Sequence, residues 1–215
     1  MFNQLLVTPS LLDSFDFYKN APATWKSRAE ASFISQIKRE PVDYPKWVQA
    51  GNDFESCVQS VCNPYSTKEQ ALRNGSDNFK KVVSICHGGK FQQVLKAVRR
   101  IDDQDVCFYG RSDVEKPYTT IDLKTTPLYK GEDKYLNKSQ HKFYLALNGK
   151  KYFKYVVVEW EDDSYIKIAS VYEIDYTSPG KEHLLKELDK KVCALFEGIR
   201  TMDLWDDYYF TFSKN

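Results

Sequence analysis

The chain has 215 residues, a length most simply interpreted as one domain that is large enough to bury a substantial core. Hydrophobic residues make up 42% of it and aromatic residues 15%, a composition that excludes general disorder. The chain has 31 basic and 30 acidic residues and a net charge of +1. It therefore lacks the excess of basic residues that nucleic-acid-binding proteins often carry. A local positive groove is nevertheless compatible with a nearly neutral total charge.

The cysteine content and the N-terminal residues indicate the cellular location of the protein. The five cysteines (57, 62, 86, 107 and 193) include no Cys-x-x-Cys pair and are odd in number, which is typical of reduced thiols in a cytosolic protein. The N-terminus has no basic-then-apolar leader, and no run approaches the ~18 apolar residues that a membrane span needs. We therefore expect a soluble, cytoplasmic protein without membrane association.

The N-terminal part is predicted to be helical. Thr8 is a suitable N-cap and Pro9 a suitable first residue for a helix that continues through Tyr18. A second helix is predicted over residues 25–38 and a third over residues 45–62. The third helix has an apolar stripe at three- and four-residue steps, which we expect to be buried. The stripe consists of Trp47, Gly51, Phe54, Val58 and Val61.

The next stretch leads from helices into strands. Residues 66–73 begin like a helix, and residues 77–86 are predicted to form another short one. Residues 91–101 are ambiguous between helix and strand. We interpret them as a strand because residues 102–105 make a turn into the aromatic strand at 106–109.

Two segments after this strand carry candidate chemistry. Residues 110–113 (Gly-Arg-Ser-Asp) and 121–126 (Ile-Asp-Leu-Lys-Thr-Thr) read as two strands joined by a short polar connection. Residues i and i+2 of a strand project to one face, so Asp122 and Lys124 point the same way and a hairpin partner can place Asp113 beside them. Two carboxylates at one point repel each other unless a cation lies between them, and such hard oxygen ligands suit Mg²⁺ or Mn²⁺. A lysine beside the metal can orient or help deprotonate a water and balance the charge on a phosphate.

The C-terminal part alternates again between helix and strand. A polar loop at residues 127–137 precedes a helix predicted from Ser139 to about Leu147. Strands are predicted at 152–159 and 165–173, and a long helix opens after Ser178-Pro179. The aromatic tail at 205–212 either covers a sheet edge or meets another subunit. We expect a single domain over residues 1–215, made of a helical part (8–86), a catalytic core (90–175) and a C-terminal helix with its tail (178–215).

The ordered set of motifs resembles the core of the PD-(D/E)XK nucleases, in the branch that contains RecB, RecE and lambda exonuclease. In that branch the catalytic strand reads as an apolar residue, Asp, then apolar-Lys-Thr, and the next helix carries Gln-x-x-x-Tyr, which Gln140 and Tyr144 supply here. The resemblance covers residues 8–144 in motif order, and the C-terminal third fits only by pattern. It implies an α/β fold with a restriction-endonuclease-like core, in which helices flank a short mixed sheet of four or five strands.

The resemblance also implies roles for single residues. The catalytic set would be Asp113, Asp122, Lys124 and Gln140. The metal ligands would be Glu55, Asp113, Asp122 and the carbonyl of Leu123. The substrate contacts would be Tyr144, Arg111, Thr125, Lys130 and Lys134. Glu55 matches a Gly-x-x-x-Glu element of the family that starts at Gly51, with Asp53 as a spare candidate. The alternative for Glu55, Gln140 and the loop lysines is an ordinary solvated surface position.

The implied cofactor is Mg²⁺ or Mn²⁺, and the implied partner is DNA. An iron–sulfur cluster is not expected, because some relatives hold it with an early cysteine and a late trio, whereas this chain has only Cys193 late and none before Cys57. The implied activity is metal-dependent hydrolysis of DNA phosphodiesters, with an exonuclease on double-stranded ends favoured over an endonuclease. A phage gene product acting in recombination or repair is suggested, in the cytoplasm of a host cell, as a homo-oligomer or with a recombination partner. The alternative is a catalytically silent nucleic-acid-binding or host-interaction protein on the same fold.

Overall fold

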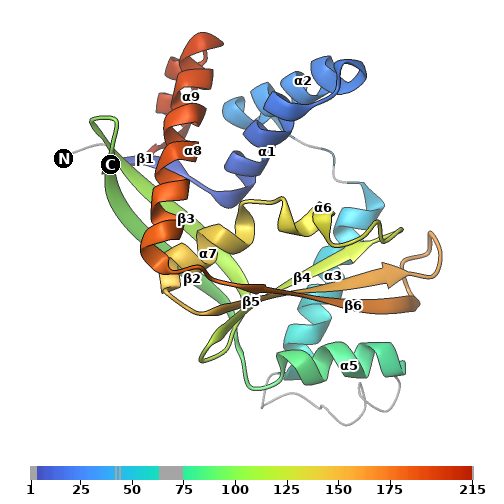
Figure 1. Cartoon of the computed structure of the whole chain (residues 1–215). Helices are drawn as coiled ribbons and strands as arrows, with labels where there is room; N and C mark the ends of the chain where they lie inside the picture. The colour runs from blue at the N-terminus through green and yellow to red at the C-terminus, as the bar shows by residue number, and fades with distance from the viewer. Residues whose placement is uncertain (1–3, 42, 44, 63–74, 215) are drawn as a thin grey trace.

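The computed structural model describes residues 4–41, 43, 45–62 and 75–214 (Figure 1). The helix-like pattern at residues 66–73 lies outside the described residues. The predicted α/β class is confirmed, since a mixed sheet lies between two groups of helices. No helix in the described ranges combines the length and the apolar character needed to cross a membrane.

Most predicted helices form within one residue of their predicted bounds. The helices are α1 (Pro9–Asn20), α2 (Lys26–Lys38), α3 (Lys46–Cys62), α5 (Asp77–Cys86), α6 (Asp133–Leu136), α7 (Gln140–Asn148), α8 (Lys181–Thr201) and α9 (Trp205–Phe212), with a 3-10 turn at Ala23–Trp25. The strands are β1 (Gln4–Val7), β2 (Lys90–Ile101), β3 (Gln104–Glu115), β4 (Thr119–Thr126), β5 (Tyr152–Trp160), β6 (Ile168–Thr177) and β7 (Ser213–Lys214).

The sheet has seven strands within the described part of the chain, in the order β6-β5-β4-β3-β1-β7, with β2 paired to β3 off this path. The prediction of four or five strands was therefore too low. The additional strands, β1 and β7, are four and two residues long, too short for a period-two pattern to reveal them. β4 runs parallel to β5, and β1 runs parallel to β3, whereas the other pairs are antiparallel.

Helices cover both faces of the sheet (Figure 1). One apolar cluster joins the sheet to α1, α2, α7, α8 and α9, and a second joins it to α3 and α5. Neighbouring residues of β4 and β5 alternate between the two, since Leu123 and Val156 belong to the second cluster and Tyr155 and Val157 to the first. The sheet is therefore buried on both sides around β4, where the candidate chemistry lies.

The N-terminal helix starts as predicted. The Thr8 side chain accepts a hydrogen bond from the backbone N–H of Leu11 at 3.2 Å, and Pro9 occupies the first turn. In the third helix, Phe54 and Val58 are buried, but Trp47 is 47% exposed. The prediction that Trp47 belongs to the buried stripe was wrong, because it lies in the first turn of α3, beyond the end of the second apolar cluster.

Three boundaries in the C-terminal part differ from the prediction. Strand β6 begins at Ile168, three residues later than predicted, because Tyr165 adopts a left-handed φ of 56° inside the turn that precedes it. The polar loop at 127–137 contains the short helix α6. The aromatic tail forms α9, which packs against α2 and β1, and β7 then pairs with β1. The tail therefore covers a sheet edge, one of the two alternatives that the sequence left open.

The buried side chain of His141 should make the stability of the fold depend on pH. Its ring is fully buried against Tyr176, and burial lowers the pKa of His141 from 6.5 to about 4. A folded-state pKa below the unfolded value means that the unfolded chain binds the proton first, so stability falls as the pH drops from about 6.5 to about 4. The pKa difference corresponds to a loss of about 3 kcal/mol. Urea unfolding at pH 7, 5.5 and 4 should show wild type losing this stability relative to His141→Phe, and equal slopes in the two proteins would contradict it.

Candidate active site

The site begins where strands β3 and β4 separate. The two strands pair at Val114–Ile121 and Glu115–Thr120, and no further rung follows. Beyond the last rung, the carboxylate of Asp113 accepts a hydrogen bond from the backbone N–H of Leu123 at 2.8 Å. A side chain thus takes the place of the missing ladder bond. This holds an acidic group inside the fork between the strands.

Asp122 and Lys124 share one face of β4, as the period-two argument predicted. Oδ2 of Asp122 lies 2.5 Å from Nζ of Lys124 in an ion pair, and Oδ1 accepts a hydrogen bond from Nε2 of Gln140 at 2.5 Å. Asp122 is only 1% exposed, whereas 36% of the Lys124 side chain is exposed. The strand therefore buries its acid and leaves part of the Lys124 side chain exposed.

The acidic side chains of the site disfavour one another's charge. Burial, and then the charge of Asp113, raises the pKa of Glu55 to about 7. Burial likewise raises the pKa of Asp122 to about 7, with Asp113 and Glu55 adding to it and Lys124 opposing it. The pKa of Asp113 is also raised, chiefly by burial. Burial raises the pKa of all three carboxyl groups, and the charge of Asp113 raises those of Glu55 and Asp122 further, so added positive charge is favourable here.

Lys124 has the opposite shift. Burial alone would lower its pKa, but the carboxylates of Asp122 and Asp113 outweigh burial and raise the pKa of Lys124 above its ordinary value. Lys124 is therefore an ammonium at neutral pH. In this state it can donate hydrogen bonds and neutralise negative charge, but it has no free lone pair with which to accept a proton.

The oxygen-bearing groups of the site are of the chemical types that bind a divalent cation. Carboxylate oxygens and a backbone carbonyl are the ligands that Mg²⁺ and Mn²⁺ prefer, and Asp113, Asp122, Glu55 and the Leu123 carbonyl are of these types. In the described part of the chain, no three His, Cys, Asp or Glu side chains gather closely enough to enclose a metal ion. The acids are instead held by neighbours, since Gln92 donates a hydrogen bond to Glu55 and Lys124 neutralises Asp122.

Two clefts reach the end of β4, and both are lined by Lys124 and Thr125. The first has a volume of about 230 Å³ and lies on the α3 side, where Glu55 and Asp113 line it. The second has a volume of about 440 Å³ and is lined by α1, α6 and α7, including Lys134. Lys124 is therefore reached from two clefts.

The remaining predicted substrate contacts are distributed unevenly. Lys134 lines the second cleft, and burial, followed by the charges of Lys130 and Lys138, lowers the pKa of Lys134. Lys130 is exposed and lines neither cleft. Arg111 is exposed, and its backbone carbonyl accepts a hydrogen bond from the Tyr144 hydroxyl at 2.8 Å. Tyr144 thus braces β3 rather than presenting its hydroxyl to a cleft.

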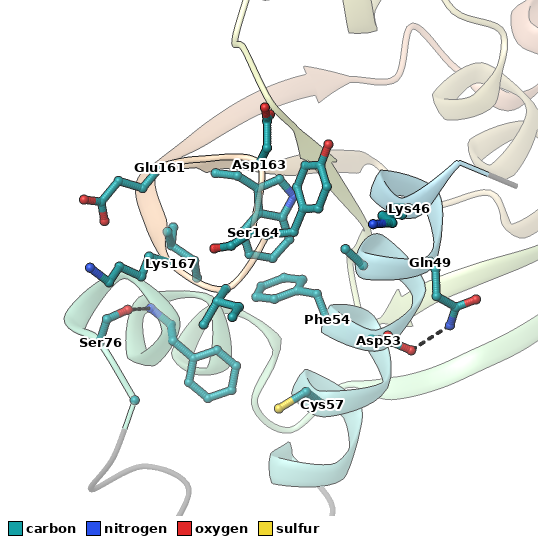
Figure 2. A pocket seen from close by; sticks show the side chains of 17 residues that line it. Lys46, Gln49, Asp53, Phe54, Cys57, Ser76, Glu161, Asp163, Ser164 and Lys167 are labelled. Atoms are coloured by element: carbon teal, nitrogen blue, oxygen red, sulfur yellow. Dashed lines mark hydrogen bonds between the residues drawn. The ribbon is translucent and has the colours of Figure 1, made fainter.

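A larger pocket of about 1090 Å³ lies on another side of α3, between α3, the start of α5 and the β5–β6 hairpin (Figure 2). Phe54 points into it, and Asp53 of the same helix accepts a hydrogen bond from Gln49 at 2.8 Å. The spare ligand candidate Asp53 thus lines this pocket and not the cleft at the fork. The lining of the pocket is mainly apolar, so the fork remains the candidate active site.

Sequence reasoning missed Gln92, which contacts Glu55 from near the start of β2. A glutamine within a strand carries no motif, and its contact depends on a backbone distortion that has no sequence signature. Ser10 and Asp13 of α1, which line the second cleft, were also missed.

Gly110 tests how closely β3 packs on α7. A Cβ at this position would lie 2.5 Å from Cε1 of Tyr144 and 3.4 Å from Cε1 of Phe143. Gly110→Ala should therefore displace Tyr144 and destabilise the fold by about 1–3 kcal/mol, measured by urea unfolding. The same substitution in a Tyr144→Leu background should cost less, and strictly additive penalties would contradict the contact.

Comparisons with known proteins support the fold. No protein-family model matches the chain, and no curated protein sequence matches it. Among solved structures, it is similar to a phage-related exonuclease from Haemophilus somnus 129PT (TM-score 0.51, 14% identity, 96% of this chain and 94% of that one). It is also similar to the alkaline exonuclease LHK-Exo from Laribacter hongkongensis (TM-score 0.50, 12% identity, 95% and 91%) and to SSO0001 (TM-score 0.50, 13% identity, 90% and 78%). The chain thus shares the fold of these solved structures, two of which carry the name exonuclease, as the resemblance of its motifs predicted.

Proposed function

We propose that the protein is a metal-dependent deoxyribonuclease that hydrolyses phosphodiester bonds, acting as an exonuclease on the ends of double-stranded DNA. The observation that carries this proposal is the fork between β3 and β4, where Asp113, Asp122 and Lys124 converge in a fold shared with two exonucleases. Fold alone does not specify chemistry, so the argument rests on these side chains.

In the proposed reaction, Asp113, Asp122, Glu55 and the Leu123 carbonyl would hold Mg²⁺ or Mn²⁺. The bound ion would act as a Lewis acid that polarises the phosphate and stabilises the leaving oxygen. Lys124, as an ammonium, would orient the attacking water through a hydrogen bond and neutralise charge that develops on the phosphate. Gln140 would keep Asp122 in position through its hydrogen bond to Oδ1.

The substrate would be bound mainly through its backbone. Lys134 lines the cleft next to Lys124, and its ammonium lies near two other positive groups, Lys130 and Lys138. Such a local positive charge, in a chain of net charge +1, favours phosphate contacts whose strength falls with salt. Two structural neighbours carry the name exonuclease, which supports action at DNA ends, and one is phage-related, which supports a phage-type recombination or repair role.

The first experiment compares linear and covalently closed circular double-stranded DNA, each with Mg²⁺, Mn²⁺ or EDTA. The proposal expects loss of the linear form only, with either metal and not with EDTA. Nicking of the circle would retain the site but change the activity to an endonuclease. No cleavage of single- or double-stranded DNA with either metal would overturn the proposal.

One observation favours a second candidate, a catalytically silent nucleic-acid-binding or host-interaction protein. The site acids are held by neighbouring side chains, because Asp122 is paired with Lys124 and Glu55 accepts from Gln92. A protein that bound DNA in a gel-shift assay but cleaved none with either metal would fit this candidate.

A further inference from the structure

The pairing of β2 with β3 is interrupted opposite a candidate metal ligand. The two strands pair residue by residue from Lys90–Glu115 to Ile101–Gln104, except at the rung where Gln92 faces Asp113. At that position Gln92 has a φ of 53°, in the left-handed region that a non-glycine residue in a strand rarely adopts. A backbone conformation of this kind is unfavourable and persists only when its surroundings enforce it.

Neighbouring side chains satisfy the backbone around this distortion. The amide of Gln93 donates a hydrogen bond to the carbonyl of Phe91 at 2.7 Å, and the hydroxyl of Ser112 donates to the carbonyl of Gln93 at 3.4 Å. The distortion is thus built into the local structure. It belongs to the class of strained positions that concentrate at functional sites.

The distortion coincides with a contact between β2 and α3. Nε2 of Gln92 donates a hydrogen bond to Oε1 of Glu55. Glu55 is half-buried, and the charge of Asp113 adds to the burial that disfavours ionisation of Glu55. A neutral amide can hold the Glu55 carboxylate in place without adding a positive charge that would compete with a metal ion. The Gln92 amide binds only Oε1 of Glu55, so Oε2 takes no part in this hydrogen bond.

We propose that Gln92 is a positioning residue for the metal site, whose distorted backbone directs its amide to Glu55 and holds that carboxylate toward Asp113. The inference rests on the proposed function, since it assumes that Glu55 binds a divalent cation. Gln92 itself touches neither the metal nor the substrate. It acts in the way that outer partners of metal ligands act elsewhere, by fixing the orientation of a ligand before the ion arrives.

The test measures Mn²⁺ binding to the DNA-free protein by isothermal titration calorimetry, together with the Mn²⁺ dependence of cleavage. Gln92→Leu keeps the approximate size of the side chain and removes the amide, and it should weaken Mn²⁺ binding by about 10- to 100-fold. The metal concentration for half-maximal cleavage should rise by the same factor. Cleavage at saturating Mn²⁺ should change less than the affinity.

Two further variants separate positioning from folding. Gln92→Gly removes the amide and also the backbone strain, so it should lose Mn²⁺ affinity while keeping or raising the melting temperature. Gln49→Leu is the matched control, because it removes an amide that donates to a carboxylate outside the fork, that of Asp53, and it should leave the affinity for Mn²⁺ unchanged.

The outcomes distinguish this inference from the proposed function. Wild-type cleavage together with unchanged Mn²⁺ affinity in Gln92→Leu would overturn the role of Gln92 and leave the nuclease proposal intact. A fall in the maximal rate without a change in Mn²⁺ affinity would also overturn it. A wild-type protein that neither binds Mn²⁺ nor cleaves DNA would overturn both.

Discussion

Lys124→Ala is expected to lower the rate of DNA cleavage by on the order of 10³-fold, the size of effect seen when one preorganised charge-stabilising donor is removed from an active site. Nζ of Lys124 lies 2.5 Å from Asp122, and the adjoining carboxylates keep it protonated. Alanine would remove the ammonium of a side chain that lines both clefts and leave the buried Asp122 without its counter-charge. Single-turnover cleavage of linear duplex DNA at saturating Mg²⁺ measures the effect on the chemical step.

A lysine on the neighbouring strand offers the matched control. Lys154 of β5 also forms ion pairs, at 2.7 Å with Glu173 and 3.1 Å with Asp175, but it lines neither cleft. Lys154→Ala should retain cleavage within a few-fold. Lys124→Met keeps most of the aliphatic stem and should be as inactive as the alanine variant, which separates lost charge from lost packing. A Lys124→Met protein with near wild-type activity would contradict the role proposed for the ammonium.

Local patterns predicted much of this structure. Strand geometry alone determines which residues of β4 point to the same face of the sheet. The structure places Ile121 and Leu123 in one apolar cluster, with Asp122 and Lys124 on the other face. The N-cap at Thr8 was equally local. These features depend on residues a few positions apart, so the sequence contains the information directly.

Other features depend on distant contacts and could not be predicted in the same way. The hydrogen bond from Leu123 to Asp113 exists because two strands diverge, and the bond between Gln92 and Glu55 exists because one rung of a ladder is distorted. Strand β7 forms only because α9 folds back over β1. Trp47 fits the helical period but extends beyond the apolar cluster that would cover it. Periodicity indicates which face of an element is apolar and not how far its neighbours extend.

Asp122→Asn is expected to lower the rate of cleavage by on the order of 10³-fold without lowering the stability of the fold at pH 8. The pKa of Asp122 is raised from 3.8 to about 7, mainly by burial. A folded-state pKa above the unfolded value means that the folded protein binds the proton more tightly, so wild type loses stability as the pH rises from about 4 to about 7. The cost of ionising the buried group is on the order of 2–4 kcal/mol, shared with the other acids of the site. Asparagine has nearly the same shape and no charge, so the variant should avoid the cost of ionising a buried group. The loss of the ion pair with Lys124 should offset part of this gain in stability.

The pH and metal dependence of urea unfolding tests this expectation. Between pH 5 and pH 8, wild type should lose stability relative to Asp122→Asn, and saturating Mg²⁺ should restore wild type more than the variant because the ion neutralises the ionised carboxylates. His141 lowers stability below about pH 6.5 in both proteins alike, so its effect cancels in the comparison. An equal pH slope in both proteins would show that Asp122 is ionised without cost and would contradict the buried-charge argument. An equal gain from Mg²⁺ in both would instead show that the ion binds without Asp122, so that the metal would have to be held by Asp113 and Glu55 alone.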